Sequence, residues 1–223
     1  MSKLVWDKVG EREYRIGVNH GVLYPFTEEG VPGAGVAWNG LTSVSDNASG
    51  GEANPIYADN IKYLNLMSEE EESLTINAYT YPDEFEECDG SKEVAPGVFI
   101  KQQNRKHFGF CYSNKIGNDL EGEDYGEEIH LLYDCVASPS EKSYTTINDS
   151  KEAIEFSWEG STTKVEVGVD GVKDTASLTV KSTKTSPDKM KALKDILYGT
   201  EEKEPRLPSI AEVIALVGEP AHH

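Results

Sequence analysis

The side chains best suited to chemistry are carboxylates concentrated in one segment. Glu69–Glu72 are followed by Asp83, Glu84, Glu86, Glu87 and Asp89, with no Lys or Arg between Glu69 and Gly90. Paired carboxylates could catalyse glycoside hydrolysis, but one of them must then lie in an apolar pocket that raises its pKa. The surrounding sequence provides no such pocket. We therefore interpret the segment as a solvated acidic face and expect that the protein is not an enzyme.

A second acidic segment follows Asn118 and invites comparison with a calcium-binding loop. Counting from Asp119, acids occupy positions 1, 3 and 5, but position 6 is Asp124 instead of Gly and position 12 is His130 instead of Glu. The segment therefore fails as an EF-hand loop. Weak, opportunistic cation binding stays open as an alternative to a flexible acidic surface loop.

Histidine, cysteine and glycine form no recognisable site. None of the five histidines lies beside a Cys or a carboxylate at metal-ligand spacing, and Cys88, Cys111 and Cys135 contain no CxxC. An odd number of widely spaced cysteines favours free thiols in a reducing compartment. The glycines of Gly30–Gly35 give GxxGxG, which is no phosphate-binding fingerprint. We predict no catalytic residue, no cofactor and no metal.

The net charge of the chain argues against some classes of binding function. The chain has 40 acidic and 21 basic residues among 223, a formal charge of -19. This charge opposes binding that works by neutralising phosphates or anionic lipids. Because no signal-peptide core and no 18-residue apolar run occurs, we expect a soluble chain made in the cytosol.

The elements that must position these residues centre on the stretch Gly35–Gly90. Val36–Ser45 and Ser73–Thr80 alternate apolar and polar side chains, which predicts two strands with one core face and one wet face, with a bulge near Gly40. Pro82 and the acids after it predict a short helix that ends by Gly90. Between the strands, residues 46–67 form a long loop with many apolar residues. Such a loop normally packs against something.

The rest of the chain predicts a mainly-β fold with a helical end. Further strands are expected at residues 11–26, 107–113, 128–136, 153–158, 165–169 and 176–180, the last two joined through Asp170-Gly171. Ser186-Pro187 and Gly199 delimit one short helix, and Ser209, Glu212 and Gly218 delimit another. We expect a β domain over residues 1–185, a helical appendage over 186–218 packed on it, and a tail at 219–223, where His222-His223 could be natural or a tag remnant.

At this point a family resemblance is visible in several segments. Asn54–Leu64 (NPIYADNIKYL) and Ala78–Gly90 (AYTYPDEFEECDG) resemble the major tail tube proteins of long-tailed, non-contractile bacteriophages. Gln102–Tyr112, Gly117–Asp119, Pro139–Lys142 and Ile147–Glu159 fit the same family in the same order. The resemblance is long and collinear, from about Leu4 to Gly218.

The resemblance implies a two-sheet β-sandwich or barrel, flanked by a short helix, whose copies form hexameric rings that stack into a tail tube. It implies a virion protein assembled in the host bacterial cytoplasm, a tape measure protein inside the tube, and tail tip and terminator proteins at its ends. DNA would pass through without specific binding during genome ejection, and no membrane is involved.

Two sets of residues follow from combining this resemblance with the strand pattern. We expect Asn39, Ser43, Ser45, Thr75 and Asn77 to face the lumen. We expect Pro55, Ile56, Tyr57, Tyr63 and Leu64 to contact another subunit. The alternatives are the inner tube of a contractile tail or tail-like particle, a carbohydrate-binding β-sandwich that uses Trp and Tyr, and the acid-pair hydrolase.

Overall fold

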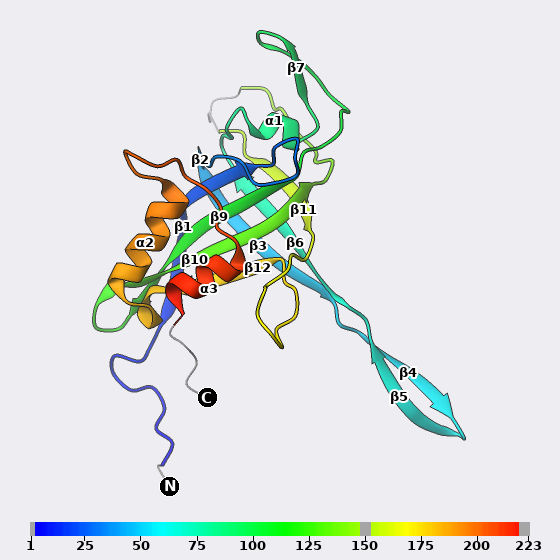
Figure 1. Cartoon of the computed structure of the whole chain (residues 1–223), viewed down its shortest axis with the longest axis vertical. Coiled ribbons are helices and arrows are strands. Elements are labelled where there is room, and N and C mark those ends of the chain that lie inside the picture. Colours follow the sequence, from blue (N-terminus) through cyan, green and yellow to red (C-terminus); the bar gives the residue numbers. More distant parts are fainter. Residues whose placement is uncertain (1–2, 148–152, 219–223) are drawn as a thin grey trace.

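The computed structural model describes residues 3–147 and 153–218, and its fold is mainly β, with 47% strand and 13% helix (Figure 1). The strands are β1 (Tyr14–Pro25), β2 (Val36–Trp38), β3 (Leu41–Gly50), β4 (Ala53–Ala58), β5 (Ile61–Met67), β6 (Glu70–Ala78), β7 (Lys92–Ala95), β8 (Val98–Ile100), β9 (Phe108–Asn118), β10 (Gly122–Ala137), β11 (Phe156–Thr162) and β12 (Ser177–Lys181). The helices are α1 (Phe85–Cys88), α2 (Pro187–Tyr198) and α3 (Ile210–Val217), with a 3-10 turn at Ser182–Lys184.

One antiparallel sheet of eight strands forms the body. Its strand order is β2-β1-β9-β10-β11-β6-β3, and β12 pairs with β10 beside β11. The end strands β2 and β3 are consecutive in the chain and are joined through Asn39-Gly40, so the sheet bends back on itself. The expected two packed sheets are therefore two parts of one continuous sheet.

Two hydrophobic cores lie on the two sides of β1, β9 and β10. The inner core is enclosed by the bent sheet and contains Trp38, Phe110, Ile76 and Trp158, with Phe85 of α1 inserted among them. The outer core lies under α2 and α3, which cover the other side of these strands in Figure 1. Strands β9 and β10 are thus covered on both faces, which explains why their apolar residues occupy both parities.

The C-terminal helices begin and end close to their sequence signals. Pro187 opens α2, and the Ser209 hydroxyl accepts a hydrogen bond from the Glu212 backbone N–H at the start of α3. Leu193 and Val213 are buried in the outer core. The helices therefore pack on the body; residues 219–223, including His222-His223, lie outside the described residues.

Three expectations about local structure were wrong. The strand expected over Val36–Ser45 is two strands, because the chain leaves β1 at Trp38 and joins β6 from Leu41 onward, with Gly40 at φ +76° in the link. The strand expected at residues 165–169 is only a single bridge between Val165 and Thr175. The expected loop over residues 46–67 is the end of β3 followed by the hairpin β4–β5.

Candidate functional site

A polar face covers the outside of β3, β6 and β11. In the ladder Ser43 is opposite Asn77 and Ser45 is opposite Thr75, so these four predicted residues lie together on one face. The Asn77 side-chain N–H donates to the Ser43 hydroxyl at 2.8 Å. Their neighbours Leu74, Ile76 and Ala78 point the other way, into the inner core.

Strand β11 extends this face, which sequence reasoning did not foresee. Ser157 is opposite Asn77 and Glu159 is opposite Thr75. The alternation of β11 predicts that these side chains point outward, but not that β11 pairs with β6. The polar face consists of Ser43, Ser45, Asn47, Ser73, Thr75, Asn77, Ser157, Glu159 and Ser161. It carries no Lys or Arg, so it lacks the charges that hold phosphates.

Asn39 does not lie on the polar face. It lies in the link between β2 and β3, where the chain changes its neighbouring strand, and its side chain is exposed. The expectation grouped it with Ser43 because both were assigned to one continuous strand. The link breaks that alternation.

The hairpin β4–β5, which we call the arm, projects from the end of the β3–β6 pair (Figure 1). Asp59 and Asn60 form its tip with φ of 50° and 63°, the positive values of a type I′ turn. At its base the Ser68 backbone N–H donates to the Glu52 carbonyl at 3.0 Å. The arm is therefore a continuation of the strand pair, beyond Gly50 and Gly51.

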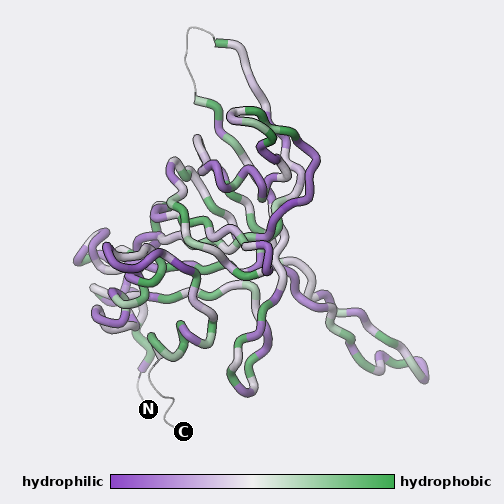
Figure 2. The backbone as a smooth tube through the Cα atoms, turned by 45° about the horizontal axis from the view of Figure 1, so that its top comes forward, coloured by the Kyte–Doolittle hydropathy of each residue, from purple (hydrophilic) through white to green (hydrophobic). Residues whose placement is uncertain are grey.

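Every residue of β4 and β5 is exposed, although many are apolar. Figure 2 shows hydrophobic residues along the arm, away from the body. All five residues expected at a subunit contact lie here: Pro55, Ile56, Tyr57, Tyr63 and Leu64. Met67, whose role was not predicted, is equally exposed, together with Ile61 and Leu66. The subunit contact expected here stays a prediction, and the exposed apolar surface is what such a contact would require.

Two carboxylates lie where the β3–β6 pair leaves the body. Asp46 is opposite Leu74, and Glu72 is the next residue of β6 on that side of the pair. Desolvation and the neighbouring Glu72 raise the pKa of Asp46 to about 6. Such a pKa would suit an acid catalyst, but Asp46 and Glu72 line neither the pocket between β12 and α3 nor the pocket beside Lys101 and Tyr144.

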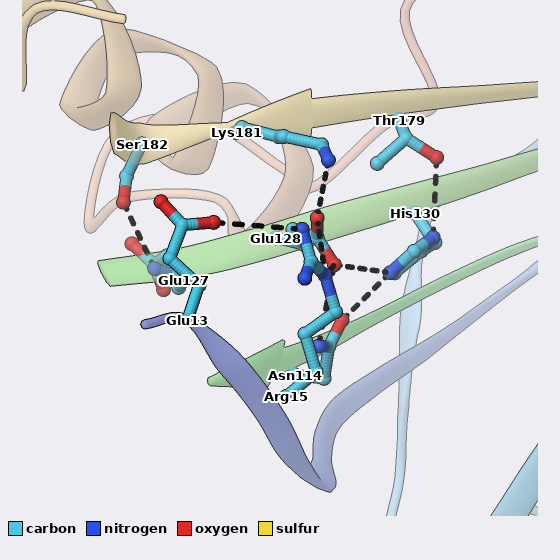
Figure 3. Close-up of polar contacts among 9 residues, drawn as sticks. All are labelled: Glu13, Arg15, Asn114, Glu127, Glu128, His130, Thr179, Lys181 and Ser182. Atoms are coloured by element: carbon cyan, nitrogen blue, oxygen red, sulfur yellow. Dashed lines mark hydrogen bonds and ion pairs between the residues drawn. The ribbon is translucent and has the colours of Figure 1, made fainter. Parts of the chain in front are cut away.

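A polar network surrounds Glu128 on the inner face of β10 (Figure 3). The Arg15 Nε donates to both carboxylate oxygens at 3.0 Å, and the Lys181 Nζ lies 2.9 Å from Oε1. Burial raises the pKa of Glu128, but hydrogen bonds from Lys181 and Arg15 outweigh it and bring the pKa below its ordinary value. The network joins β1, β10 and β12.

His130 belongs to the same network. Its Nε2 lies 2.7 Å from the Asn114 side-chain oxygen, its Nδ1 lies 3.2 Å from the Thr179 hydroxyl, and its ring stacks on Tyr112. Burial lowers the pKa of His130. A neutral ring with both nitrogens engaged has no free group for catalysis, so we assign this network a structural role.

The other candidate sites have local explanations. Asp119 accepts a hydrogen bond from the Gly10 backbone N–H at 2.8 Å, which occupies the first position of the failed calcium loop. Trp38 and Trp158 are buried in the inner core and cannot form a sugar-binding platform, whereas Trp6 is exposed, so carbohydrate binding stays an alternative. No group of three or more His, Cys, Asp or Glu residues within 3–147 and 153–218 could hold a metal ion.

Within the described part of the chain, no helix is long and apolar enough to cross a membrane. No protein-family model matches this chain, and a search of curated proteins finds no match.

Proposed function

We propose that this chain is the structural subunit of a bacteriophage tail tube, in which hexameric rings stack to form the conduit for genome ejection. One feature carries the proposal. The strand pair β3–β6 bears the polar face along the body and continues into an exposed apolar arm. A tube subunit requires both properties, since its wall must not retain DNA and its copies must hold one another.

The free edge of β3 supports assembly through strands. Among the described strands β3 is hydrogen-bonded only to β6; Gly21 of β1 lies beside its Leu41 end, and the rest of its other edge is unpaired. Exposed edges are an aggregation hazard unless they are paired or covered. In a ring, the β3–β6–β11 parts of neighbouring copies would form one shared inner barrel, which removes these edges.

The polar face suits the wall of a lumen because it carries no Lys or Arg. A Lys or Arg on the wall would offer phosphate contacts, and many such contacts together give sequence-independent affinity for DNA. Ser, Thr, Asn and Glu side chains occupy these positions instead. In this proposal the tape measure protein fills the lumen before DNA passes, and tail tip and terminator proteins close the two ends.

Negative-stain electron microscopy of the purified chain tests this function. We expect rings or tubes with six-fold symmetry, either directly or after concentration. The matched control replaces residues 53–67 by a short Gly-Ser turn; it should keep the circular dichroism of the parent and stay monomeric. A parent chain that remains monomeric at high concentration would contradict the proposal. The subunit of a contractile tail's inner tube, or of a tail-like particle, would give the same images, because the purified chain would form a tube without a sheath in each case.

A further inference from the structure

A second exposed hairpin, formed by β7 and β8, projects from the α1 end of the body (Figure 1). Its apolar residues Val94, Val98, Phe99 and Ile100 are all exposed. Like the arm, it is a two-stranded sheet that no other described strand joins. An isolated two-stranded hairpin is marginally stable in water, so both hairpins gain from a partner.

The bases of the two hairpins carry opposite charge. Lys92 opens β7, Lys101 directly follows β8, and neither forms an ion pair with a described residue. Glu69–Glu71 lie at the base of the arm and are exposed; Glu69 already lies 3.6 Å from Lys164 Nζ, whereas Glu70 and Glu71 form no ion pair with a described residue. Opposite charges at two apolar surfaces steer them together and disfavour like-with-like contacts.

The lengths of the two hairpins fit a partial overlap. β7 and β8 have 4 and 3 residues, whereas β4 and β5 have 6 and 7. The shorter hairpin therefore covers only part of the arm. With the two bases side by side, it covers the half that contains Leu66 and Met67 and brings Lys92 and Lys101 toward Glu69–Glu71.

We propose that the arm of one copy docks on the β7–β8 hairpin of another copy. This inference deepens the proposed tube function and rests on it for the biological setting. The two surfaces differ, so the contact is heterologous: each copy gives one arm and receives another. Contacts of this type generate closed rings or continuing stacks instead of two-fold dimers.

Two half-defective variants test the contact. The arm variant carries Leu66→Asp and Met67→Asp, and the hairpin variant carries Val98→Asp and Phe99→Asp. Each should remain folded by circular dichroism and monomeric by sedimentation velocity. An equimolar mixture should form a 1:1 dimer that grows no further, because each variant still has one intact surface. Leu120→Asp, an exposed apolar position outside both hairpins, is the control and should assemble as the parent does. If either variant fails to fold, Leu66→Ser and Phe99→Ser replace the double substitutions.

The outcomes separate this contact from the tube function. Variants that still assemble, or a mixture that stays monomeric while the parent forms tubes, would overturn the contact and leave the tube. A parent chain that associates through these surfaces without forming rings or tubes would support the contact and overturn the tube. A parent that never associates would overturn both.

Charge reversal supplies an independent readout. Lys92→Glu with Lys101→Glu should weaken association at low salt at least tenfold, and should do so less at high salt. Adding Glu69→Lys and Glu70→Lys in the mixing partner should restore it. Absence of this restoration would show that the two bases do not meet.

Discussion

Replacing Tyr57 and Tyr63 together by Ala should weaken assembly while leaving the single chain folded. Both side chains lie on the arm, with exposed fractions of 68% and 66%. A residue that is mostly exposed in the isolated chain contributes little to its folding. It contributes fully only where a second copy covers it.

The expected size of the effect follows from the exposed area. If a tyrosine presents roughly 200 Å², about 130 Å² of each side chain remains for a partner to cover, which at ~25 cal/mol per Å² is about 3 kcal/mol per residue. The double variant should thus lose as much as ~6 kcal/mol per contact, an upper bound that corresponds to more than a thousandfold in affinity. The unfolding free energy of the isolated chain should fall by only ~1 kcal/mol.

The assay compares assembly with stability in the same preparations. Light scattering and negative-stain images measure assembly, and urea unfolding of the unassembled chain measures stability. Tyr24→Ala is the matched substitution, because Tyr24 is fully buried and its hydroxyl donates to the Leu197 carbonyl at 2.7 Å. It should cost ~3–5 kcal/mol of folding stability. If the arm variant loses stability on the scale of Tyr24→Ala, the arm packs within its own chain and the reasoning fails.

Four further outcomes are expected. Ser43→Lys should leave assembly intact but make tubes bind short DNA duplexes in a salt-dependent way; binding equal to that of the parent would refute the assigned role of the polar face. Glu128→Gln should lower the unfolding free energy by about 2–3 kcal/mol at pH 7, which is less than for a fully buried ion pair because Arg15 and Lys181 are half-exposed. The difference in urea midpoint between variant and parent should shrink as the pH falls below the ordinary Glu pKa of 4.5, where Glu128 becomes protonated. Asp46, whose pKa is raised to about 6, makes the folded chain more stable as pH falls from 7 to 5; Asp46→Asn should remove this rise, about 1 kcal/mol after solvent screening, in the same titration. Gly50→Ala should speed hydrogen exchange in the arm, because φ is +81° and a Cβ would lie 2.1 Å from the Glu69 carbonyl oxygen.

Sequence patterns correctly predicted those elements whose structure depends on residues close by in the chain. The alternation of Leu74, Ile76 and Ala78 correctly identified the core side of β6. The helix boundaries at Ser209 and Gly218 were correct because caps are local hydrogen-bond solutions. Exposure of the arm residues was also predictable, since the stretch had no evident place in a core.

Features that depend on which strands become neighbours were not predictable. The break in alternation at Gly40 and Leu41 was visible in the sequence and was interpreted as a bulge, but nothing in the sequence shows that the chain leaves β1 and pairs with β6 at this point. The Glu128 network joins residues from several strands that are far apart in the chain. The hairpin tip Asp59-Asn60 did offer a signal, but this pair favours a type I′ turn less strongly than Asn-Gly.

Placing the polar face and the arm on the same strand pair has a mechanical consequence for the proposed tube. The β3–β6 ladder runs without a register shift from Ser43 to Gly50, so the direction of the arm is set relative to the polar face. When the arm of one copy binds a second copy, the contact therefore also fixes the orientation of the two polar faces relative to each other. A lining built in this way stays continuous from copy to copy, because the contact that joins subunits also aligns the strands that line them.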